Sequence, residues 1–517
     1  MASPVVADQS AIFAFLGDPA THGLGAPVKR IDTHGAAVFL AGPDVYKVKR
    51  AVRFAYMDFS TLEKREAACR AEIAANRHNA PGLYLGVVPI TRHGGTLQLG
   101  GTGAVVEWVV HLRRFDEDAT FDLLAHRGPL GFAVIDALAQ VVVASHRHAP
   151  IRDGRAATKS LGVVLTETVD ELAMAADIFP PAAVNALRSR LTEAFERSEA
   201  LLLRRGLEGK VRRCHGDLHL RNIVLVDGKP VLFDAIEFDE ALATSDMLYD
   251  LAFLIMDLCE RKLSADANRL LNQYLWSCDD EFQEIEGLAL FPLFLSLRAA
   301  IRAKVMAAQL QFDVDRTRLR QDAQAYLEAA RRFLDPVPAR LVAIGGLSGT
   351  GKSTLAAAVA PSLGLAPGAL HVRSDIERKR QSGVDATQRL PAAAYRPGVS
   401  AQVYDRLRTL AQVGLQSGRC VILDATYRDA RERAEVDRLA AHLDVGFVGL
   451  WLEAPTKLLT QRVATRRDDI SDATAAVVSA QAEQDVGRMT WHRLDAAVPL
   501  EGLEAAALES LAERSGA

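Results

Sequence analysis

Residues 215–222 read HGDLHLRN, and residues 231–239 read VLFDAIEFD. Between them an Asp-Gly pair separates two apolar runs, a pattern that predicts a β-hairpin. The hairpin would bring three side chains together: Asp217 and Asn222 before its first strand, and Asp234 after its second. Two carboxylates and a carboxamide offer oxygen ligands that suit Mg²⁺, with one acid left to orient a hydroxyl group. The stretch therefore predicts a magnesium site with one acid free to orient a hydroxyl group.

These motifs also carry a family resemblance. HGDLH-x-x-N at residues 215–222, FD at 233–234 and YDLA at 249–252 resemble the aminoglycoside phosphotransferase and choline kinase group of the protein-kinase-like fold. The resemblance implies that Asp217 is the catalytic base and that Asn222 and Asp234 bind magnesium. The alternative is an ordinary turn with satisfied hydrogen bonds. That alternative explains any one of these residues taken alone, but it does not explain why all of them occur at this spacing.

The bulk composition bounds the class of protein. A chain of 517 residues suggests two to four domains, and its net charge of −4 gives no general attraction to nucleic acid or anionic membranes. Its five cysteines are scattered without metal-ligand spacing, which fits reduced thiols. No basic region precedes the first apolar run, and the apolar stretch at residues 288–297 is too short for a bilayer. We expect a cytoplasmic protein.

A hairpin is predicted near the N-terminus, after a short helix at residues 9–16. Two apolar runs, residues 36–40 and 45–49, flank a Gly-Pro-Asp turn. Lys47 and Lys49 lie on one face of the second strand, because side chains alternate along a strand. The resemblance implies that Lys47 holds the α- and β-phosphates of ATP. Lys49 remains the alternative, and the unused lysine would be a solvated charge.

A helix is predicted over residues 60–77, where alanines favour helix and Ser60 with Glu63 forms a capping box. The resemblance implies that Glu72 pairs with the phosphate-binding lysine. Glu63 and Glu66 lie in the same helix, and the sequence alone does not choose among the three acids. The opposing interpretation makes each of them a surface charge.

Further strands complete a small lobe, at residues 87–90, 96–99 and 104–110. The resemblance implies a hinge at the end of the last strand, where Glu107 and Val109 meet adenine through backbone groups. The turn at residues 32–35 lacks a well-formed Gly-x-Gly-x-x-Gly, a departure that aminoglycoside kinases share.

A larger helical lobe follows, with helical periodicity at residues 121–148 and 167–205. The resemblance implies that Asp250, on an apolar helix beyond the hairpin, supports the catalytic loop. An acidic run at residues 279–286 either lines a pocket for a polyamine or amino sugar or simply begins a solvated helix.

The second half of the chain begins after the Pro-x-Pro linker at residues 335–338. A buried strand at residues 340–344 leads into GLSGTGKST, which opens a helix. This is a Walker A loop in its expected context, where Lys352 reaches the β- and γ-phosphates and Ser353 binds Mg²⁺. The predicted nucleotide-binding residues of this loop are Gly346, Ser348, Gly349, Thr350, Gly351, Lys352, Ser353 and Thr354.

The strands that follow indicate what kind of P-loop protein this is. A strand near residue 371 leads to Asp375 and Arg378, and a strand at residues 421–424 ends in Asp424, a Walker B-like position that predicts a magnesium ligand. The segment resembles short P-loop kinases of the zeta-toxin and gluconate-kinase kind. The resemblance implies that Asp375 activates an acceptor hydroxyl and that Arg378 grips the acceptor.

Three arginines follow a further strand at residues 445–452. The resemblance implies that one of them closes on the phosphates as part of a lid, with Arg466 as the candidate and Arg462 or Arg467 as alternatives. The opposing interpretation is a solvated helix face. Acidic residues interleave with these arginines and no DNA-reading module accompanies them, so a polynucleotide acceptor is not favoured.

The expected architecture is therefore mixed α/β and α+β: a bilobal protein-kinase-like domain followed by a P-loop NTPase domain with a parallel sheet flanked by helices. The predicted domains are a small lobe at residues 1–111, a helical lobe at 112–335 and a P-loop kinase domain at 336–517.

The leading hypothesis for function is a bifunctional, ATP- and Mg²⁺-dependent kinase with two sites that transfer phosphate to hydroxyl groups of a small molecule. One alternative is a P-loop kinase or NTPase regulated by a metabolite-sensing kinase-like domain, which the intact Asp217 and Asp234 disfavour. An antibiotic-modifying phosphotransferase is another, because fold and motif do not identify the acceptor. No membrane partner is expected, and the sequence leaves the oligomeric state open.

Overall fold

The computed structural model describes residues 5–54, 57–310, 316–465 and 470–513. It contains two compact units, Met1–Val164 with Leu202–Asp257 and Leu165–Leu201 with Leu258–Ala517. The boundary between the units falls within three helices, α5 Gly154–Met174, α6 Pro181–Leu207 and α8 Met247–Glu260. The domain limits expected at residues 111 and 335 remain predictions.

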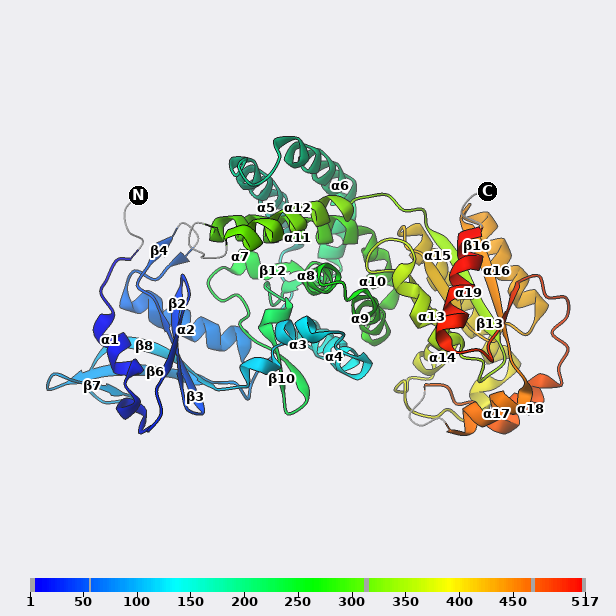
Figure 1. Cartoon of the computed structure of the whole chain (residues 1–517), viewed down its shortest axis with the longest axis horizontal. Helices are drawn as coiled ribbons and strands as arrows, with labels where there is room; N and C mark the ends of the chain where they lie inside the picture. Colours follow the sequence, from blue (N-terminus) through cyan, green and yellow to red (C-terminus); the bar gives the residue numbers. More distant parts are fainter. Residues whose placement is uncertain (1–4, 55–56, 311–315, 466–469, 514–517) are drawn as a thin grey trace. The chain divides into compact units, whose positions relative to one another are not determined.

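The first unit begins with a six-stranded sheet in the order β1-β2-β3-β8-β6-β7 (Figure 1). All neighbouring strands in it are antiparallel, as expected from the hairpin signals. Its strands are β1 Lys29–Asp32, β2 Ala36–Ala41, β3 Asp44–Lys49, β6 Tyr84–His93, β7 Thr96–Leu99 and β8 Ala104–Arg113. A separate short pair is formed by β4 Arg53–Phe54 and β5 Met57–Asp58.

Two helices cover this sheet. Helix α1, Ser10–Gly17, buries Ile12 and Leu16 against one face, and helix α2, Leu62–Asn76, packs on β8 and β6. The expected capping box at Ser60 and Glu63 is wrong, because Thr61 is the N-cap and its side chain accepts a hydrogen bond from the Lys64 N–H at 3.3 Å. Ser60 instead donates its own N–H to Asp58.

The rest of the first unit carries the hairpin that the sequence predicts. Strands β10, Ile223–Val226, and β11, Lys229–Leu232, pair antiparallel across Asp227 and Gly228. Both turn residues have positive φ, 51° and 75°, as a two-residue hairpin turn requires. The other elements here are α3 Phe121–Arg127, α4 Phe132–His148, β9 Val211–Arg213, α7 Glu240–Ala243 and β12 Thr244–Asp246.

The second unit contains a five-stranded parallel sheet in the order β14-β15-β13-β16-β17. Its strands are β13 Arg340–Gly346, β14 Leu370–Arg373, β15 Val421–Asp424, β16 Gly446–Glu453 and β17 His492–Asp495. The central strand β13 is almost wholly buried and apolar, as parallel strands covered on both faces are. Mixed α/β architecture with an antiparallel sheet followed by a parallel sheet confirms the predicted fold class.

Helices flank this parallel sheet (Figure 1). Helices α13, Lys352–Val359, and α19, Leu500–Glu513, share one apolar core with alternate residues of the strands. Helices α15, Pro397–Gln416, and α16, Ala430–His442, contact β15 and β16. The remaining helices of this region are α14 Ser374–Gln381, α17 Thr456–Thr465 and α18 Ala475–Ala482.

The second unit also includes four complete helices that precede the linker. They are α9 Ser264–Ser277, α10 Glu281–Gly287, α11 Phe291–Gln309 and α12 Arg316–Arg332. Single 3₁₀ turns occur along the chain at Pro19–His22, Glu117–Ala119, Leu220–Asn222, Leu288–Leu290, Ala360–Ser362 and Ala392–Tyr395. None of the helices in the part of the chain that the structure describes has the length and apolarity that crossing a bilayer requires.

Candidate active sites

The catalytic loop of the first unit holds Asp217 and Asn222 side by side. The Asn222 Nδ2 donates to the backbone carbonyl of Asp217 and to its Oδ2, both at 2.9 Å. His219 also lies near this carboxylate, 3.3 Å from Oδ2. The Asp217 side chain is 39% exposed, whereas Asn222 is buried. The loop thus holds one carboxylate in place and exposes it to solvent. A general base needs such exposure, because it has to reach the acceptor.

Asp234 completes this group at the end of the hairpin. Its residue has a left-handed backbone, φ 60°, and its N–H donates to the Tyr84 hydroxyl at 3.1 Å. The next N–H, of Ala235, donates to the Asn76 side chain at 2.8 Å. Helix α2 and strand β6 therefore fix the segment that carries the predicted metal ligand. Asn76 and Tyr84 were not identified from the sequence, because their partners lie about 150 residues away.

A charge network, buried at Glu72 and partly exposed at Asp234, joins the predicted phosphate lysine to the helix acid. Lys47 Nζ lies 2.9 Å from Glu72 Oε1 and 2.7 Å from Asp234 Oδ1. Glu72 is fully buried, so the surface-charge interpretation of this residue is wrong. Burial disfavours its ionised form, but the charges of Lys47 and Lys49 outweigh burial and lower its pKa.

The same balance holds for the other two partners. Burial opposes the charge of Lys47, but Asp234 and Glu72 raise the pKa of this lysine well above its usual value. Burial also opposes ionisation of Asp234, and the charge and hydrogen bond of Lys47 lower its pKa. The three groups are therefore charged at neutral pH.

Lys49 lies deeper than Lys47. Its Nζ is 2.6 Å from Glu72 Oε2 and bonded to Glu237, and its side chain is only 3% exposed. Lys47 is 17% exposed and directly contacts the predicted metal ligand. This geometry favours Lys47 as the phosphate lysine and gives Lys49 the task of neutralising two buried acids. The donor and acceptor set fits Mg²⁺ and a nucleotide phosphate: one lysine, two carboxylates and a carboxamide.

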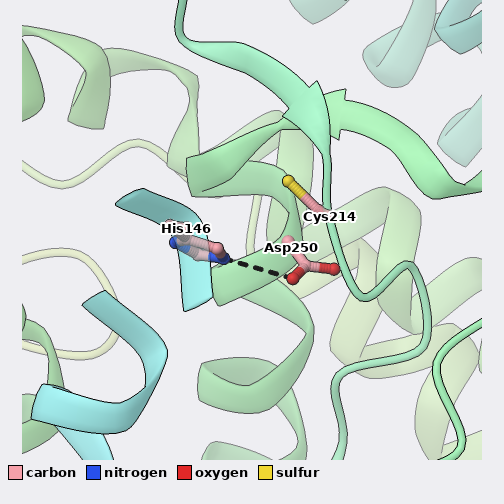
Figure 2. A group of neighbouring side chains, drawn as sticks. All are labelled: His146, Cys214 and Asp250. Carbon is pink, nitrogen blue, oxygen red and sulfur yellow. Dashed lines mark hydrogen bonds and ion pairs between the residues drawn. The ribbon is translucent and has the colours of Figure 1, made fainter. Parts of the chain in front are cut away.

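Asp250 supports the catalytic loop through hydrogen bonds, as the resemblance implies. Its Oδ1 accepts the Gly216 N–H at 2.8 Å and its Oδ2 accepts the His215 N–H at 3.3 Å. Figure 2 shows His146 bonded to the same carboxylate, at 3.2 Å, with Cys214 beside them. Three potential ligand atoms of buried residues thus lie within 4.8 Å of one another. Because the carboxylate already accepts these bonds, we interpret the cluster as a support for the loop.

The expected hinge at Glu107 and Val109 is contradicted by the structure. Strand β8 continues to Arg113, and Val109 pairs with Val48 on one side and Val88 on the other. Its backbone groups are therefore used within the sheet. The Glu107 side chain is buried and bonded to Arg65 and Gln9. Strand β8 ends only at Arg113, beyond the expected hinge residues.

The Walker A loop of the second unit has the backbone that the sequence predicts. Gly346, Gly349 and Gly351 have positive φ values, of 141°, 90° and 89°. A Cβ on Gly346 would lie 2.7 Å from the Leu452 carbonyl, and one on Gly349 would lie 2.9 Å from the Leu459 carbonyl. Helix α13 begins at Lys352, so its first N–H groups point out of the helix and suit phosphate oxygens.

Three side chains bond to the backbone of this loop. Lys352 Nζ donates to the Leu347 carbonyl at 3.0 Å, so it must change partner to reach a phosphate. Gln481 of α18 accepts the Ser348 N–H at 2.9 Å. Thr350 is buried and donates its hydroxyl to the same Leu347 carbonyl. Gln481 was not identified from the sequence, because no local pattern marks a residue 133 positions away.

The predicted magnesium ligands of the second site meet at the end of β15. Ser353 Oγ donates to Asp424 Oδ2 at 2.5 Å, and His371 Nε2 is 3.0 Å from the same oxygen. Arg373 Nη2 donates to Ser353 Oγ at 3.1 Å. Burial opposes ionisation of Asp424, but the His371 hydrogen bond and nearby cations hold its pKa well below its usual range. An ionised carboxylate beside a serine hydroxyl fits Mg²⁺.

The predicted acceptor residues lie at the start of α14. Burial raises the pKa of Asp375, against the effect of Arg373, which suits a group that takes up a proton. Arg378 is buried, donates to the Ala394 carbonyl at 2.7 Å and lies over the Tyr395 ring. Its side chain is thus already held by the chain, and acceptor binding by Arg378 stays a prediction.

The structure places only one of the three arginines proposed for the lid. Arg466 and Arg467 lie outside the described residues, so the structure does not place them. Arg462 donates to the Ala496 carbonyl at 2.8 Å.

The acidic run near α10 has mainly a structural role. Asp280 caps the helix, and Glu281 is buried against Arg380 and Arg406.

The fold and the two sites define a protein with two phosphotransferase-type regions, and comparison with known families agrees. The model of the phosphotransferase enzyme family matches residues 42–289. A model of an AAA domain, of the P-loop kinase kind, matches residues 341–484. These matches support phosphotransferase activity in general. Both families generally use ATP with Mg²⁺.

Two mycobacterial relatives match over nearly the whole chain. Uncharacterized proteins of Mycobacterium tuberculosis and Mycobacterium bovis are each 31% identical to it over 477 residues, covering 91% of this chain and 92% of theirs. The chain therefore belongs to one family with these proteins.

Solved structures resemble each region separately. A choline/ethanolamine kinase family protein from Mesorhizobium loti is 13% identical and covers 63% of this chain and 94% of its own, with a TM-score of 0.39. A gluconokinase from Sinorhizobium meliloti is 22% identical and covers 35% of this chain and 94% of its own, with a TM-score of 0.25. An APS kinase of Mycobacterium tuberculosis is 19% identical over 34% of this chain and 99% of its own, also with a TM-score of 0.25.

Proposed function

We propose that this protein is a bifunctional kinase that transfers the γ-phosphate of ATP to hydroxyl groups of small molecules at two separate sites. One observation carries the proposal: each site gathers a lysine, a pair of oxygen ligands for Mg²⁺ and a further carboxylate. In the first site these are Lys47, Asn222 with Asp234, and Asp217. In the second site they are Lys352, Ser353 with Asp424, and Asp375.

At the first site Lys47 would bind the α- and β-phosphates, and Glu72 would hold this lysine in place. Asn222 and Asp234 would hold the metal, which neutralises charge on the phosphates when bound. Asp217 is left to orient the acceptor hydroxyl and to take up its proton. Its partial exposure and its hydrogen bond from Asn222 support that role.

At the second site Lys352 and the N–H groups of the Walker A loop would bind the phosphates. Ser353 and Asp424, in contact with each other, would hold the metal. Asp375 would accept the proton of the acceptor hydroxyl, and its raised pKa supports this. Phosphoryl transfer needs little more than aligned oxygens and charge neutralisation, so these groups suffice.

Counting bound nucleotides tests whether two sites exist. Equilibrium dialysis of the full chain with Mg²⁺ and a non-hydrolysable ATP analogue should give two nucleotides per chain. Lys47→Ala and Lys352→Ala should each lower the number to one, and the double variant to none. A single nucleotide in the wild type, removed by Lys352→Ala, would contradict the first site.

The acceptor atom needs its own test. Products of transfer from ATP should carry phosphate as a monoester on oxygen, which withstands mild acid. Loss of the phosphate in mild acid, together with a phosphoramidate resonance in the ³¹P NMR spectrum, would identify a nitrogen acceptor instead and contradict the hydroxyl assignment.

A further inference from the structure

Strand β14 is an edge strand of the parallel sheet, paired with β15 on one side alone. The backbone groups on the free side of an edge strand need partners from elsewhere. Here helix α9 supplies them. Asn268, Asn272 and Trp276 are spaced four residues apart, so they lie along one face of the helix.

This helix face bonds to the backbone of β14 and of Ala369, the residue before it, much as a neighbouring strand would. Asn268 Nδ2 donates to the Ala369 carbonyl at 3.0 Å, and Asn272 Nδ2 donates to the same carbonyl at 3.2 Å. Asn272 Oδ1 accepts the His371 N–H at 2.7 Å, and Trp276 Nε1 donates to the His371 carbonyl at 3.0 Å. Asn268 and Asn272 are buried, so these bonds are shielded from water.

The two residues of β14 that α9 holds also reach the second site. The His371 side chain is bonded to Asp424, the predicted metal ligand. The Arg373 guanidinium lies 5.6 Å from the centre of the Trp276 ring and donates to Ser353. The helix face thus contacts both predicted magnesium ligands through one intervening residue each.

The contact extends past the strand. Arg380 of α14 donates to the last carbonyls of α9, those of Leu275 at 3.0 Å and Trp276 at 2.5 Å. Arg380 also pairs with Glu281 of α10. Burial and the neighbouring Glu377 raise the pKa of Glu281 to about 8. Helix α9 is therefore joined to the second site on both sides of the Asp375 segment.

We propose that α9 serves as a substitute edge strand and that Asn272 and Trp276 are positioning residues for the magnesium site of the P-loop region. The proposal rests on the proposed function of the second site. Helix α9 lies within residues 42–289, the part matched by the phosphotransferase family, so one family's region completes the active site of the other. This arrangement couples the geometry of the second site to the helical part of the first family's region.

The test uses the full chain in an Asp217→Ala background, which silences transfer at the first site. Mg²⁺-dependent formation of ADP from ATP is measured over a series of Mg²⁺ concentrations, in the presence of a pooled extract of small metabolites that supplies the acceptor. Trp276→Phe keeps an aromatic ring and removes the Nε1 donor. Asn272→Ala removes the bonds to the Ala369 carbonyl and to the His371 N–H. Gln273→Ala is the matched control, because this amide of the same helix makes none of these bonds. Thermal unfolding of each variant checks that it is folded.

Trp276→Phe and Asn272→Ala should each raise the Mg²⁺ concentration for half-maximal turnover by about tenfold, roughly the effect of one lost hydrogen bond. Gln273→Ala should leave it unchanged. If Asn272→Ala does not fold, Trp276→Phe alone decides.

Suppose that Lys352→Ala abolishes turnover but that Trp276→Phe and the parent depend on Mg²⁺ in the same way. This result would overturn the inference and leave the proposed function standing. A loss of stability with no change in Mg²⁺ dependence would also overturn it, since α9 would then be merely structural. Absence of any Lys352-dependent turnover in the parent would refute the proposed function of the second site, and the inference with it.

Discussion

The Nζ atom of Lys47 lies 2.7 Å from the Oδ1 atom of Asp234, although 187 residues separate them. The predicted phosphate lysine and the predicted metal ligand thus neutralise each other before nucleotide binds. When bound, a phosphate would take the place of Asp234 beside Lys47, and Mg²⁺ would take the place of Lys47 beside Asp234. Glu72 contacts both Lys47 and Lys49, and Lys49 also contacts Glu237. Together with Asp234 these residues form one charge network.

The two lysines of this network should differ in their roles. Lys47→Ala should lower kcat/KM for ATP at the first site by about a hundredfold or more, because a charge-assisted contact to phosphate is lost. Lys49→Ala should mainly lower stability, because it leaves Glu72 and Glu237 short of a buried cation. Steady-state kinetics and thermal unfolding of both variants check this. The reverse pattern would make Lys49 the phosphate lysine.

Acid should destabilise the first unit through Glu72. Its folded-state pKa is below its ordinary value of 4.5, so its contribution to stability is present above about pH 4.5 and is lost as the pH falls through the folded pKa. Glu72→Gln should cost about 3 kcal/mol at pH 7 and flatten the acid dependence of unfolding. Denaturant unfolding across the acid range measures it.

Glu66→Gln is the control for that experiment, because Glu66 lies in the same helix with only an exposed partner, Arg70. It should follow the wild-type curve. If Glu72→Gln also showed the wild-type dependence of unfolding on pH, the role of Glu72 in the charge network would be contradicted.

Asp217→Ala should reduce transfer at the first site by about a hundredfold to ten-thousandfold, the usual contribution of a general base. Nucleotide binding at that site should remain, since Lys47, Asn222 and Asp234 are unchanged. Product formation and analogue binding are measured on the same preparation. Full activity in this variant would refute the catalytic assignment.

Gly349→Ala should weaken nucleotide binding at the second site by at least about tenfold. A Cβ there would approach the Leu459 carbonyl to 2.9 Å in a backbone of φ 90°, so the loop must move. Gly383→Ala is the matched control, because Gly383 has φ 65° but open space around its Cβ position. It should cost about 1 kcal/mol of stability and leave nucleotide binding unchanged. Equal binding in both variants would contradict the role of the loop.

The sequence was sufficient where local patterns determine local geometry. The hairpin around Asp227 brought Asp217, Asn222 and Asp234 together as expected. The Walker A loop likewise formed with Ser353 next to Asp424. In each case a few neighbouring residues fix the backbone, and the side chains follow.

The sequence failed where pairing over long distances decides. Nothing local shows that β8 continues to Arg113, so the hinge was placed too early, at Glu107 and Val109. The β14 contacts of Asn272 and Trp276 were missed for the same reason, since their partners lie about 100 residues away. The N-cap shifted by one residue, from Ser60 to Thr61, because neighbouring hydroxyls compete for it.

The most direct test of two phosphotransfer sites is transfer of labelled γ-phosphate from ATP into a pooled extract of small metabolites, read by mass spectrometry. Wild type, Asp217→Ala and Lys352→Ala are compared. Each variant should lose a different phosphorylated product, or the two should lose successive steps of one route. An unchanged product pattern in Asp217→Ala, with every product lost in Lys352→Ala, would contradict the account and make the first region a sensor of the second.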